Sequence, residues 1–499
     1  MKSSCGKLLW CVVAGSMAAS VAAGAGAGDV PVRGRRLSVR ANDMAAGQRI
    51  ARVVLRDPAI AAPLPDPRLG SALIIAGGAG PGECHAEIAL DPAKWHAIGG
   101  AGAQRGYRYL NAAPGTQGVR RVVIRPGAIS VSARGPGWPC ALGADQRTPL
   151  SLVLKAAEVR YCAAFGGTVA LNGPGRFLAH NAPAPASCPK TDLTVADLNI
   201  LHGITCPRPT KSCRLAERID LLFQWIARNG CPDVVTLQEV STQAKPLITA
   251  QLSSACPFDY EYVYMRTSLG IDDEMILSRY PVAAMELRRL FRNFRTVLFV
   301  RLDHPIGAVD VFSTHLASSS DGAQQPCGSE CPAACVAAGA RTVRECQAVQ
   351  MAQFIVARHD ESAPAVATGD FNASPGSFEY NQFVDRGWTD VYRAGQNPEC
   401  NPANGVGCTS GRQDEDLAEL ESPVSNESER IDYIFLIPPG AESLCKARID
   451  PAADTDGDGR TTGIFADDPN PFAASCGPAP APICWPSDHE GVQLDLNCD

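Results

Sequence analysis

Short motifs that end in polar residues carry the side chains of this sequence that could do chemistry. The stretch 366–372 is an apolar run that ends in Gly369, Asp370 and Asn372, which predicts a buried strand with a carboxylate and an amide at its end. Turns use the same residue types for conformational reasons, so this stretch alone is not specific. Five further motifs follow or lie in apolar runs: Asp197-Leu-Asn199, Gln238-Glu239, Ser313-Thr-His315-Leu316, Arg430-Ile-Asp432-Tyr-Ile-Phe435 and Ser487-Asp488-His489. We therefore expect one catalytic centre collected from the ends of several strands.

These carboxylate, amide and imidazole groups suit the hydrolysis of a phosphate ester. That reaction needs a cation on the phosphate oxygens, an activated water, and a proton or charge for the leaving group. Hard oxygen ligands favour Mg²⁺, Mn²⁺ or Ca²⁺ over metals that prefer soft ligands. Glu239 is the best metal ligand of the set because it ends a strand, and we expect Asn199 and Asp488 to complete or orient the metal shell.

With these six motifs in this order, residues of about 190–498 resemble the endonuclease/exonuclease/phosphatase superfamily, which has the DNase I-like fold. The resemblance implies a metal-dependent phosphoesterase in which Glu239 binds the metal. It also implies that Asp432 and His489 form a pair. In such a pair the carboxylate fixes the imidazole tautomer and raises its basicity, while the other ring nitrogen faces the scissile phosphate.

The resemblance assigns roles to three more residues. Asp370 would align or deprotonate the attacking water, and Asn372 would hydrogen-bond the phosphate. His315 would be a second imidazole that donates to a phosphate oxygen or to the leaving group. Every main catalytic position is filled, which argues against an inactive relative of the family.

Two supporting roles stay open in the sequence. Some DNase-type members have a glutamate that supports the first histidine, and here Asp272, Asp273 and Glu274 compete for that role because spacing does not choose between them. Arg295 is a candidate phosphate clamp, although an arginine at the start of a strand is more often a surface residue.

Apolar periodicity predicts the elements that would position these motifs. Residues 194–200 and 233–237 have the composition of strands, and residues 214–229 between them have a helical period that ends at Asn229-Gly230. Strand, helix and strand form the unit of an α/β sandwich, so the fold class expected for residues 190–499 is a two-sheet α/β sandwich of the DNase I-like type. The acidic segment 399–430 has the composition of a mobile loop. Further strands are expected at about 274–281, 295–301 and 309–315, and a further helix at about 342–357.

The first part of the chain predicts a smaller, β-rich and sandwich-like domain, because short alternating or β-branched runs recur between Gly, Pro and Asp clusters. It holds no evident acid/base pair; a ligand-like trio, Glu83, His85 and Glu87, fits a protein surface better. Two lysines, an apolar run and Ala/Gly-rich residues at the N-terminus indicate a secretory signal peptide. The segments expected are a signal peptide at 1–28, a β-rich accessory domain at 29–180, a Pro/Ala linker at 181–189 and the catalytic domain at 190–499.

Charge is distributed unevenly along the chain. Residues 29–188 contain 19 Lys and Arg against 9 Asp and Glu, whereas residues 189–499 contain 24 against 43. A basic module beside an acidic one suggests a site for a polyanion such as nucleic acid, anionic lipid or cell wall. The alternative, with at least equal weight, is solubility and contact between the two halves.

Cysteine usage indicates an oxidising compartment. Eighteen of the 20 cysteines follow the signal segment and are scattered in loops, which favours disulfides in a secreted or periplasmic protein. Cys327, Cys331, Cys335 and Cys346 could suggest zinc, but a stapled loop is favoured because no histidine is near.

Residues 454–459 are a candidate for a second metal site. Asp454, Asp456 and Asp458 resemble the start of a calcium loop, although Phe465 occupies the twelfth position instead of glutamate. An acidic, solvated turn is the favoured alternative.

Metal, water and histidine do not encode the leaving group, so the substrate stays open. A nuclease is favoured, with the basic domain supplying phosphate contacts. The alternatives are a sphingomyelinase-like phospholipase C that acts on a lipid head group, and a binding protein with a vestigial catalytic domain. We expect a monomer without a transmembrane segment.

Overall fold

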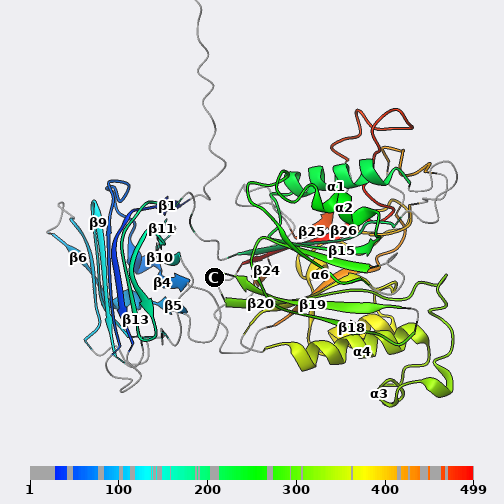
Figure 1. The fold of residues 1–499 in the computed structure, drawn as a ribbon, viewed down its shortest axis with the longest axis horizontal. Helices are drawn as coiled ribbons and strands as arrows, with labels where there is room; N and C mark the ends of the chain where they lie inside the picture. Colours follow the sequence, from blue (N-terminus) through cyan, green and yellow to red (C-terminus); the bar gives the residue numbers. More distant parts are fainter. Residues whose placement is uncertain are drawn as a thin grey trace, which may run out of the picture.

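The computed structural model (Figure 1) consists of two successive regions, each built on a pair of β-sheets. The structure describes residues 28–497 except for 42–48, 77–83, 100–104, 113–117, 136–137, 139–141, 143–148, 158, 186–187, 189–191, 203–212, 267–272, 293, 305–306, 361–362, 413–416, 425–426, 439–447, 450–461 and 467–469. The expected signal peptide at 1–28 lies outside these residues apart from Gly28.

The N-terminal region is a β-sandwich of a five-stranded and an eight-stranded sheet. The strand order is β1-β11-β10-β4-β5 in the first sheet and β12-β13-β2-β3-β9-β8-β7-β6 in the second. The strands are β1 (Asp29–Pro31), β2 (Gly34–Arg40), β3 (Ile50–Arg56), β4 (Ser71–Ala76), β5 (His85–Ala89), β6 (Trp95–Ile98), β7 (Gly106–Leu110), β8 (Val119–Arg125), β9 (Ala128–Arg134), β10 (Leu150–Ala156), β11 (Val159–Phe165), β12 (Thr168–Gly173) and β13 (Arg176–Ala182).

Period-two alternation explains this sandwich. In β2 and β3, every second residue is buried in the core between the sheets, including Leu37, Val39, Val53 and Leu55. Side chains of successive strand residues point to opposite faces, so the intervening residues face solvent. The predicted β-rich sandwich is confirmed.

The C-terminal region contains a seven-stranded and a six-stranded sheet. The strand order is β16-β17-β15-β14-β26-β24, with β25 also paired to β26, in the first sheet and β18-β19-β20-β21-β23-β22 in the second. The strands are β14 (Leu193–Asn199), β15 (Val234–Val240), β16 (Glu261–Tyr264), β17 (Asp273–Ser278), β18 (Val282–Arg289), β19 (Thr296–His304), β20 (Gly307–His315), β21 (Ala365–Asp370), β22 (Thr389–Asp390), β23 (Asp432–Ile437), β24 (Arg448–Ile449), β25 (Gly463–Phe465) and β26 (Gly491–Asn497). The helices are α1 (Leu215–Arg228), α2 (Ala244–Thr249), α3 (Ala333–Ala337), α4 (Val343–Arg358), α5 (Phe378–Val384) and α6 (Val391–Ala394).

Helices cover the outer face of each C-terminal sheet, which gives four layers (Figure 1). One apolar core joins the two sheets, a second joins α1 to the β14–β15 sheet, and a third joins α4 and α5 to the β20–β21 sheet. The central strands β14, β15, β17, β21 and β23 are almost wholly buried on both faces, so they are mostly apolar, whereas the edge strand β18 is largely exposed. This arrangement confirms the predicted two-sheet α/β sandwich.

The two long helices begin and end close to their predicted bounds. Helix α4 has a capping box, in which the Thr342 hydroxyl accepts from the backbone N–H of Glu345 and the Glu345 carboxylate accepts from that of Thr342. Helix α1 ends at Arg228, directly before Asn229-Gly230. The apolar period and the Asn229-Gly230 stop predicted α1, and the capping box at Thr342 explains where α4 begins.

The expected linker at 181–189 is attached to the N-terminal sandwich. Its first two residues belong to β13, and Cys188 is buried and disulfide-bonded to Cys162 of β11. Within the part of the chain that the structure describes, no helix is long and apolar enough to cross a membrane.

Candidate active site

Strand ends bring the motifs of the catalytic region together. Asn199 is the last residue of β14, His315 of β20 and Asp370 of β21, whereas Asp432 is the first residue of β23. In the register of the second sheet, Asp370 lies between His315 on one neighbouring strand and Asp432 on the other. Parallel pairing of β14 with β15 places Glu239 near the end of the first sheet beside Asn199. The predicted collection of polar groups at one sandwich end is therefore present.

Asp370 lies at the centre of this cluster. Its Oδ2 is 3.3 Å from His315 Nε2, 3.9 Å from His489 Nε2 and 3.1 Å from Asn199 Nδ2, which donates to it. Its Oδ1 accepts from the backbone N–H of Asn372 at 2.8 Å. Asp370 is 1% exposed. A buried carboxylate with this many partners is fixed in one orientation, as a catalytic base or ligand must be.

The close approach of β20 to β21 requires a glycine at position 369, directly before Asp370. Gly369 has φ +137°, and a Cβ there would lie 1.9 Å from the backbone oxygen of Thr314. No other residue fits this position without moving β20 away from β21.

Glu239 reaches the cluster through a local irregularity of β15. Its φ is 58°, and the pairing of β15 with β17 shifts register between Leu237 and Val240. Its Oε1 accepts from Asn199 Nδ2 at 3.1 Å, and its Oε2 accepts from the backbone N–H of His202 at 2.8 Å. Such a bulge redirects a side chain, and here it turns Glu239 toward Asn199.

His489 and Asp432 form the predicted pair. His489 Nδ1 lies 3.0 Å from Asp432 Oδ2, and the other ring nitrogen faces Asp370. Burial raises the pKa of Asp432 to about 6, against the lowering effect of His489. Burial lowers the pKa of His489, but Asp432, Asp488 and Asp370 outweigh it and raise that pKa well above its usual value. The carboxylates around His489 therefore favour the protonated form of its imidazole.

The donor set fits a divalent cation. Asp370 and Asp432 offer carboxylate oxygens within 4.8 Å of each other and of a His489 ring nitrogen, and Asn199 ties Asp370 to Glu239. The second oxygen of Asp432, Oδ1, is buried and accepts no hydrogen bond from the described residues. An unsatisfied buried carboxylate oxygen is costly unless an ion or water meets it. Oxygen donors of this kind suit Mg²⁺, Mn²⁺ or Ca²⁺.

Three further predicted residues have hydrogen bonds or ion pairs with residues outside this cluster. Asp488 is half-buried, and its Oδ1 accepts from the Ser487 hydroxyl at 3.1 Å. Arg295 is buried and ion-paired with Asp321. Glu274 is buried and accepts from the hydroxyl of Thr296. Their predicted roles as metal ligand, phosphate clamp and support for His315 stay predictions.

Several predicted residues cannot be placed. Asp272 lies outside the described residues, as do Glu83 and the candidate calcium loop of Asp454, Asp456 and Asp458. The side chains of His85 and Glu87 also lie outside the description. Asp273, which competed for the supporting role, accepts from the Tyr264 hydroxyl at 2.6 Å.

The segment 399–430 is packed against the site, contrary to the expected mobile loop. Within its described part, Arg412 is buried and donates to the backbone oxygens of Ser487 and His489 at 3.2 Å each. The Arg412 guanidinium also pairs with Glu427 and Glu490 and lies 3.7 Å from the Trp485 ring centroid. An arginine in a polar loop has the sequence signature of a surface residue, so no local signal revealed this role.

Arg430 of the Arg-Ile-Asp motif is structural. It is 1% exposed and donates to Asp390 at 2.9 Å and to Glu399 at 2.7 and 3.0 Å. These bonds fix the start of β23, two residues before Asp432. The Thr409 hydroxyl accepts from the backbone N–H of Asp432 at 3.1 Å, which adds a second constraint.

A buried polar layer between the sheets supports Glu239 from behind. Asp197 Oδ1 accepts from Gln238 Nε2 at 2.8 Å and from the Thr236 hydroxyl at 2.5 Å. Gln238 also donates to the hydroxyl of Ser313 on the other sheet at 3.2 Å. Burial raises the pKa of Asp197 to about 8, so the core favours the neutral form of this carboxyl.

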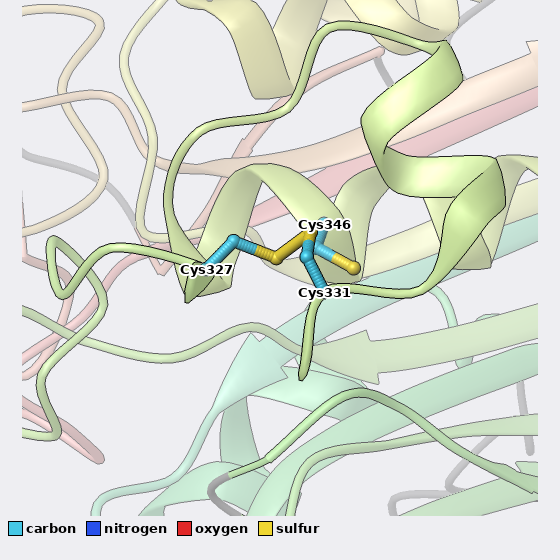
Figure 2. Close-up of side chains that lie close together, drawn as sticks. All are labelled: Cys327, Cys331 and Cys346. Carbon is cyan, nitrogen blue, oxygen red and sulfur yellow. A yellow bond between two sulfur atoms is a disulfide. The ribbon is translucent and has the colours of Figure 1, made fainter. Parts of the chain in front are cut away.

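The cysteine-rich insert holds disulfides instead of a zinc site. Cys327, Cys331 and Cys346 lie close together (Figure 2), but Cys327 is bonded to Cys331, and Cys346 is bonded to Cys335. Oxidised cysteines cannot act as thiolate ligands, so the predicted stapled loop is confirmed. The described residues also include the disulfides Cys231–Cys256, Cys400–Cys408 and Cys476–Cys484, and these bonds are consistent with an extracellular or otherwise oxidising compartment.

Comparisons with known proteins show which family these features belong to. Curated protein sequences give no match. Among solved structures, a humanized zebrafish (D. rerio) TDP2 is 16% identical, with 62% of this chain and 100% of that chain covered and a TM-score of 0.42. A truncated Caenorhabditis elegans TDP2 is 18% identical, with 61% and 97% covered and a TM-score of 0.39. A mannosyl-6-phosphatase of Bacteroides thetaiotaomicron is 17% identical, with 61% and 99% covered and a TM-score of 0.41.

The sequence profile described as the Endonuclease/Exonuclease/phosphatase family matches residues 198–489, which is more than half of the chain. The match begins one residue before Asn199 and ends at His489, so it spans the whole cluster around Asp370. The chain therefore belongs to the endonuclease/exonuclease/phosphatase family and is a hydrolase of this metal-dependent phosphoesterase superfamily.

Proposed function

We propose that the protein is a secreted phosphodiesterase that cleaves nucleic acid with the help of a divalent cation. The observation that carries the proposal is the Asp370-centred cluster, in which two histidines, three carboxylates and an amide converge at one end of the sandwich. A phosphodiester needs this combination of cation ligands, base and positive charge because its own charge repels nucleophiles.

Glu239, held in place by Asn199, would bind the cation, and Asp432 Oδ1 is a further oxygen open to it. When bound, the cation would neutralise charge on the phosphate oxygens. The carboxylates thus place positive charge where the substrate is most negative.

The protein's own groups would handle the proton and the developing charge. Asp370 would orient the attacking water and accept its proton. Protonated His489, held by Asp432, would present Nε2 toward the phosphate and stabilise negative charge as it develops. His315, 3.3 Å from Asp370, would donate to a phosphate oxygen or to the leaving group.

Asn372 completes the proposed set. Its φ is 50°, and its side-chain amide donates to the backbone oxygen of Leu316 at 3.0 Å. This bond fixes the amide plane beside Asp370, where the amide would position the phosphate.

An exposed aromatic residue near this end of the sandwich supports a nucleic-acid substrate. Phe294 is 58% exposed and precedes β19 in the turn from β18. Val297 of β19 pairs with Thr314, the neighbour of His315. An exposed ring beside a phosphate site can stack on a base.

The test is hydrolysis of a substrate panel by the oxidatively folded mature protein, with Mg²⁺, Mn²⁺ or Ca²⁺ and with chelator. The panel holds plasmid DNA, RNA, sphingomyelin vesicles, a sugar phosphate and a bis-aryl phosphodiester. Chelator-sensitive cleavage of DNA or RNA is expected. Turnover of sphingomyelin or of the sugar phosphate with both nucleic acids intact would replace the nuclease with a lipid or phosphomonoester activity.

A further inference from the structure

The outer face of the eight-stranded N-terminal sheet is lined with arginines. In β2, β3, β8 and β9 the inward residues form the core, and the outward positions carry arginine, serine or small apolar residues. We call the following nine exposed residues the arginine face: Arg36, Arg40, Arg52, Arg56, Arg108, Arg121, Arg125, Arg134 and Arg176.

Strand register shows how these charges are spaced. Arg52 pairs with Ser132, and Ser132 pairs with Arg121 on the next strand, so a serine separates the two guanidinium groups by roughly 10 Å. Arg40 and Arg176, in contrast, lie directly opposite each other on β2 and β13. Like charges in directly opposed positions destabilise a sheet, and a bound anion removes that cost.

No carboxylate on the same strands balances this charge. The strands of the eight-stranded sheet contain no aspartate or glutamate. Among the described residues, the ion pairs of this region join Arg33 to Asp57, Arg68 to Asp66, Lys94 to Asp91 and Arg160 to Asp29. None of them includes a member of the arginine face. A broad positive field on a folded surface attracts anionic polymers and raises their association rate.

The chemistry of the face favours the phosphate backbone of a nucleic-acid duplex. All nine cations are arginines, whose planar guanidinium binds phosphate in a bidentate way. The aromatic residues of these strands, Trp95, Tyr107, Tyr109 and Phe177, are buried, so the face offers no ring on which an unstacked base could lie. Eight strands span roughly 34 Å, which is about one turn of a B-form duplex.

A lipid surface fits the face less well. Binding at a membrane interface combines basic residues with an apolar surface that inserts between the lipids. The large apolar side chains that are well exposed on this sheet, Leu110 and Leu171, lie on β7 and β12, close to opposite edges of the sheet.

We propose that the arginine face binds the phosphate backbone of double-stranded nucleic acid without reading its sequence. The proposal of duplex binding rests on the geometry and charge of the face alone. Its use, to hold a polymeric substrate for the catalytic region, rests on the proposed nuclease activity.

The test is fluorescence anisotropy of a labelled 20-base-pair duplex with the full-length mature protein, in chelator so that no cleavage occurs. The variant Arg40→Gln/Arg52→Gln/Arg121→Gln removes three charges from the face. Arg228→Gln/Arg341→Gln/Arg386→Gln, all exposed in the C-terminal region, is the matched control. Thermal unfolding of each protein confirms that it is folded.

The face variant is expected to bind the duplex about 30-fold or more weakly, because it loses phosphate contacts. Each lost contact should also lower the slope of log K against log salt concentration by about one. The control is expected to keep its affinity within about threefold and its salt slope unchanged. Equal losses in both variants, no duplex binding by the unaltered protein, or binding to anionic vesicles in place of duplex would overturn the proposal.

Cleavage of plasmid DNA and of a bis-aryl phosphodiester, measured with metal, separates the two proposals. Duplex binding through the arginine face without DNA cleavage would contradict the proposed nuclease activity and leave the proposed duplex binding intact. DNA cleavage by the unaltered protein together with unchanged duplex binding by the face variant would contradict only the proposed binding by the arginine face.

Discussion

At the scale of single residues, Asn199 holds Glu239, the expected metal ligand, and Asp370, the expected base. Its amide donates to Glu239 and Asp370 at 3.1 Å each, and its own oxygen accepts from the backbone N–H of Leu201. Asn199→Ala is expected to raise the Mg²⁺ concentration for half-maximal activity by about tenfold or more, because partners of metal ligands contribute that much to affinity. A metal titration of activity measures this, with Asn172→Ala, exposed on β12 of the N-terminal sandwich, as control. An unchanged midpoint would remove Asn199 from the metal site.

We propose Phe294 as a second single-residue determinant, this time of substrate preference. Phe294→Ala is expected to lower kcat/KM on DNA by about tenfold, since stacking on one base contributes about 1–3 kcal/mol. The small bis-aryl phosphodiester, which has no neighbouring base, reports on the chemistry alone and should change less than twofold. Equal losses on both substrates would show that Phe294 acts on the site itself and not on a base.

The residue types of the site were predictable, whereas much of its support was not. Asp370, His315, Asp432 and His489 each follow or begin an apolar run, and this local pattern is visible in one sequence. Arg412 has no such pattern, because its partners lie 75 or more residues away or in a polar loop. Its burial follows only from tertiary packing.

At the scale of elements, the sheet that carries His315 and Asp370 is braced by a buried ion pair at its far end. Asp310 of β20 accepts from Arg301 of β19 at 2.7 and 2.9 Å and from the backbone N–H of Asp360 at 3.1 Å. Burial raises the pKa of Asp310, but these hydrogen bonds and the nearby His359 outweigh it and hold the pKa below its ordinary value of 3.8. The ionised form is therefore stabilised by folding.

Asp310→Asn is expected to lower the free energy of unfolding by about 3 kcal/mol at pH 7, because it leaves a partly buried arginine without its charge partner. A depressed carboxyl pKa gives stability that is present above the unfolded-state pKa and lost as pH falls through the folded-state pKa. The difference from the unaltered protein should therefore shrink below about pH 4. Urea unfolding at pH 7 and pH 3 measures it, and a deficit that is equal at both pH values would contradict the linkage.

Elements with strong local signals were predicted, and elements that depend on distant partners were not. The apolar period and the Asn229-Gly230 stop marked α1, and a helix was expected at about 342–357, where α4 lies. The segment 399–430 has a polar composition like that of a free loop, yet Cys400–Cys408 and the buried Arg412 and Arg430 fix its described parts. Pairing over such distances is not encoded in local composition.

At the scale of the whole molecule, we propose that the two sandwiches are separate domains. Each has its own apolar core, and Cys188 fastens the Pro/Ala segment to the first of them. Limited proteolysis of the oxidised protein is expected to cut between Cys188 and β14 and to release two resistant fragments. Mass spectrometry identifies the cut, and a first cut inside either sandwich would contradict this division.

The distribution of charge shows most clearly what can be predicted from the sequence at this scale and what only the structure reveals. The excess of basic residues before residue 189 was visible as a count, but a count does not say where the charges lie. Strand alternation and register place nine arginines on one face, with Arg40 directly opposite Arg176.

The central claim, that the Asp370-centred cluster is a metal-dependent phosphodiesterase site, is tested most directly by hydrolysis of a bis-aryl phosphodiester. The proteins compared are the unaltered chain, Glu239→Gln, His489→Asn and, as control, the well-exposed Glu330→Gln. We predict that chelator abolishes the activity, that the first two variants lose about 100-fold or more in kcat, and that the control keeps its rate. Full activity in both Glu239→Gln and His489→Asn, or activity that chelator does not affect, would contradict the account.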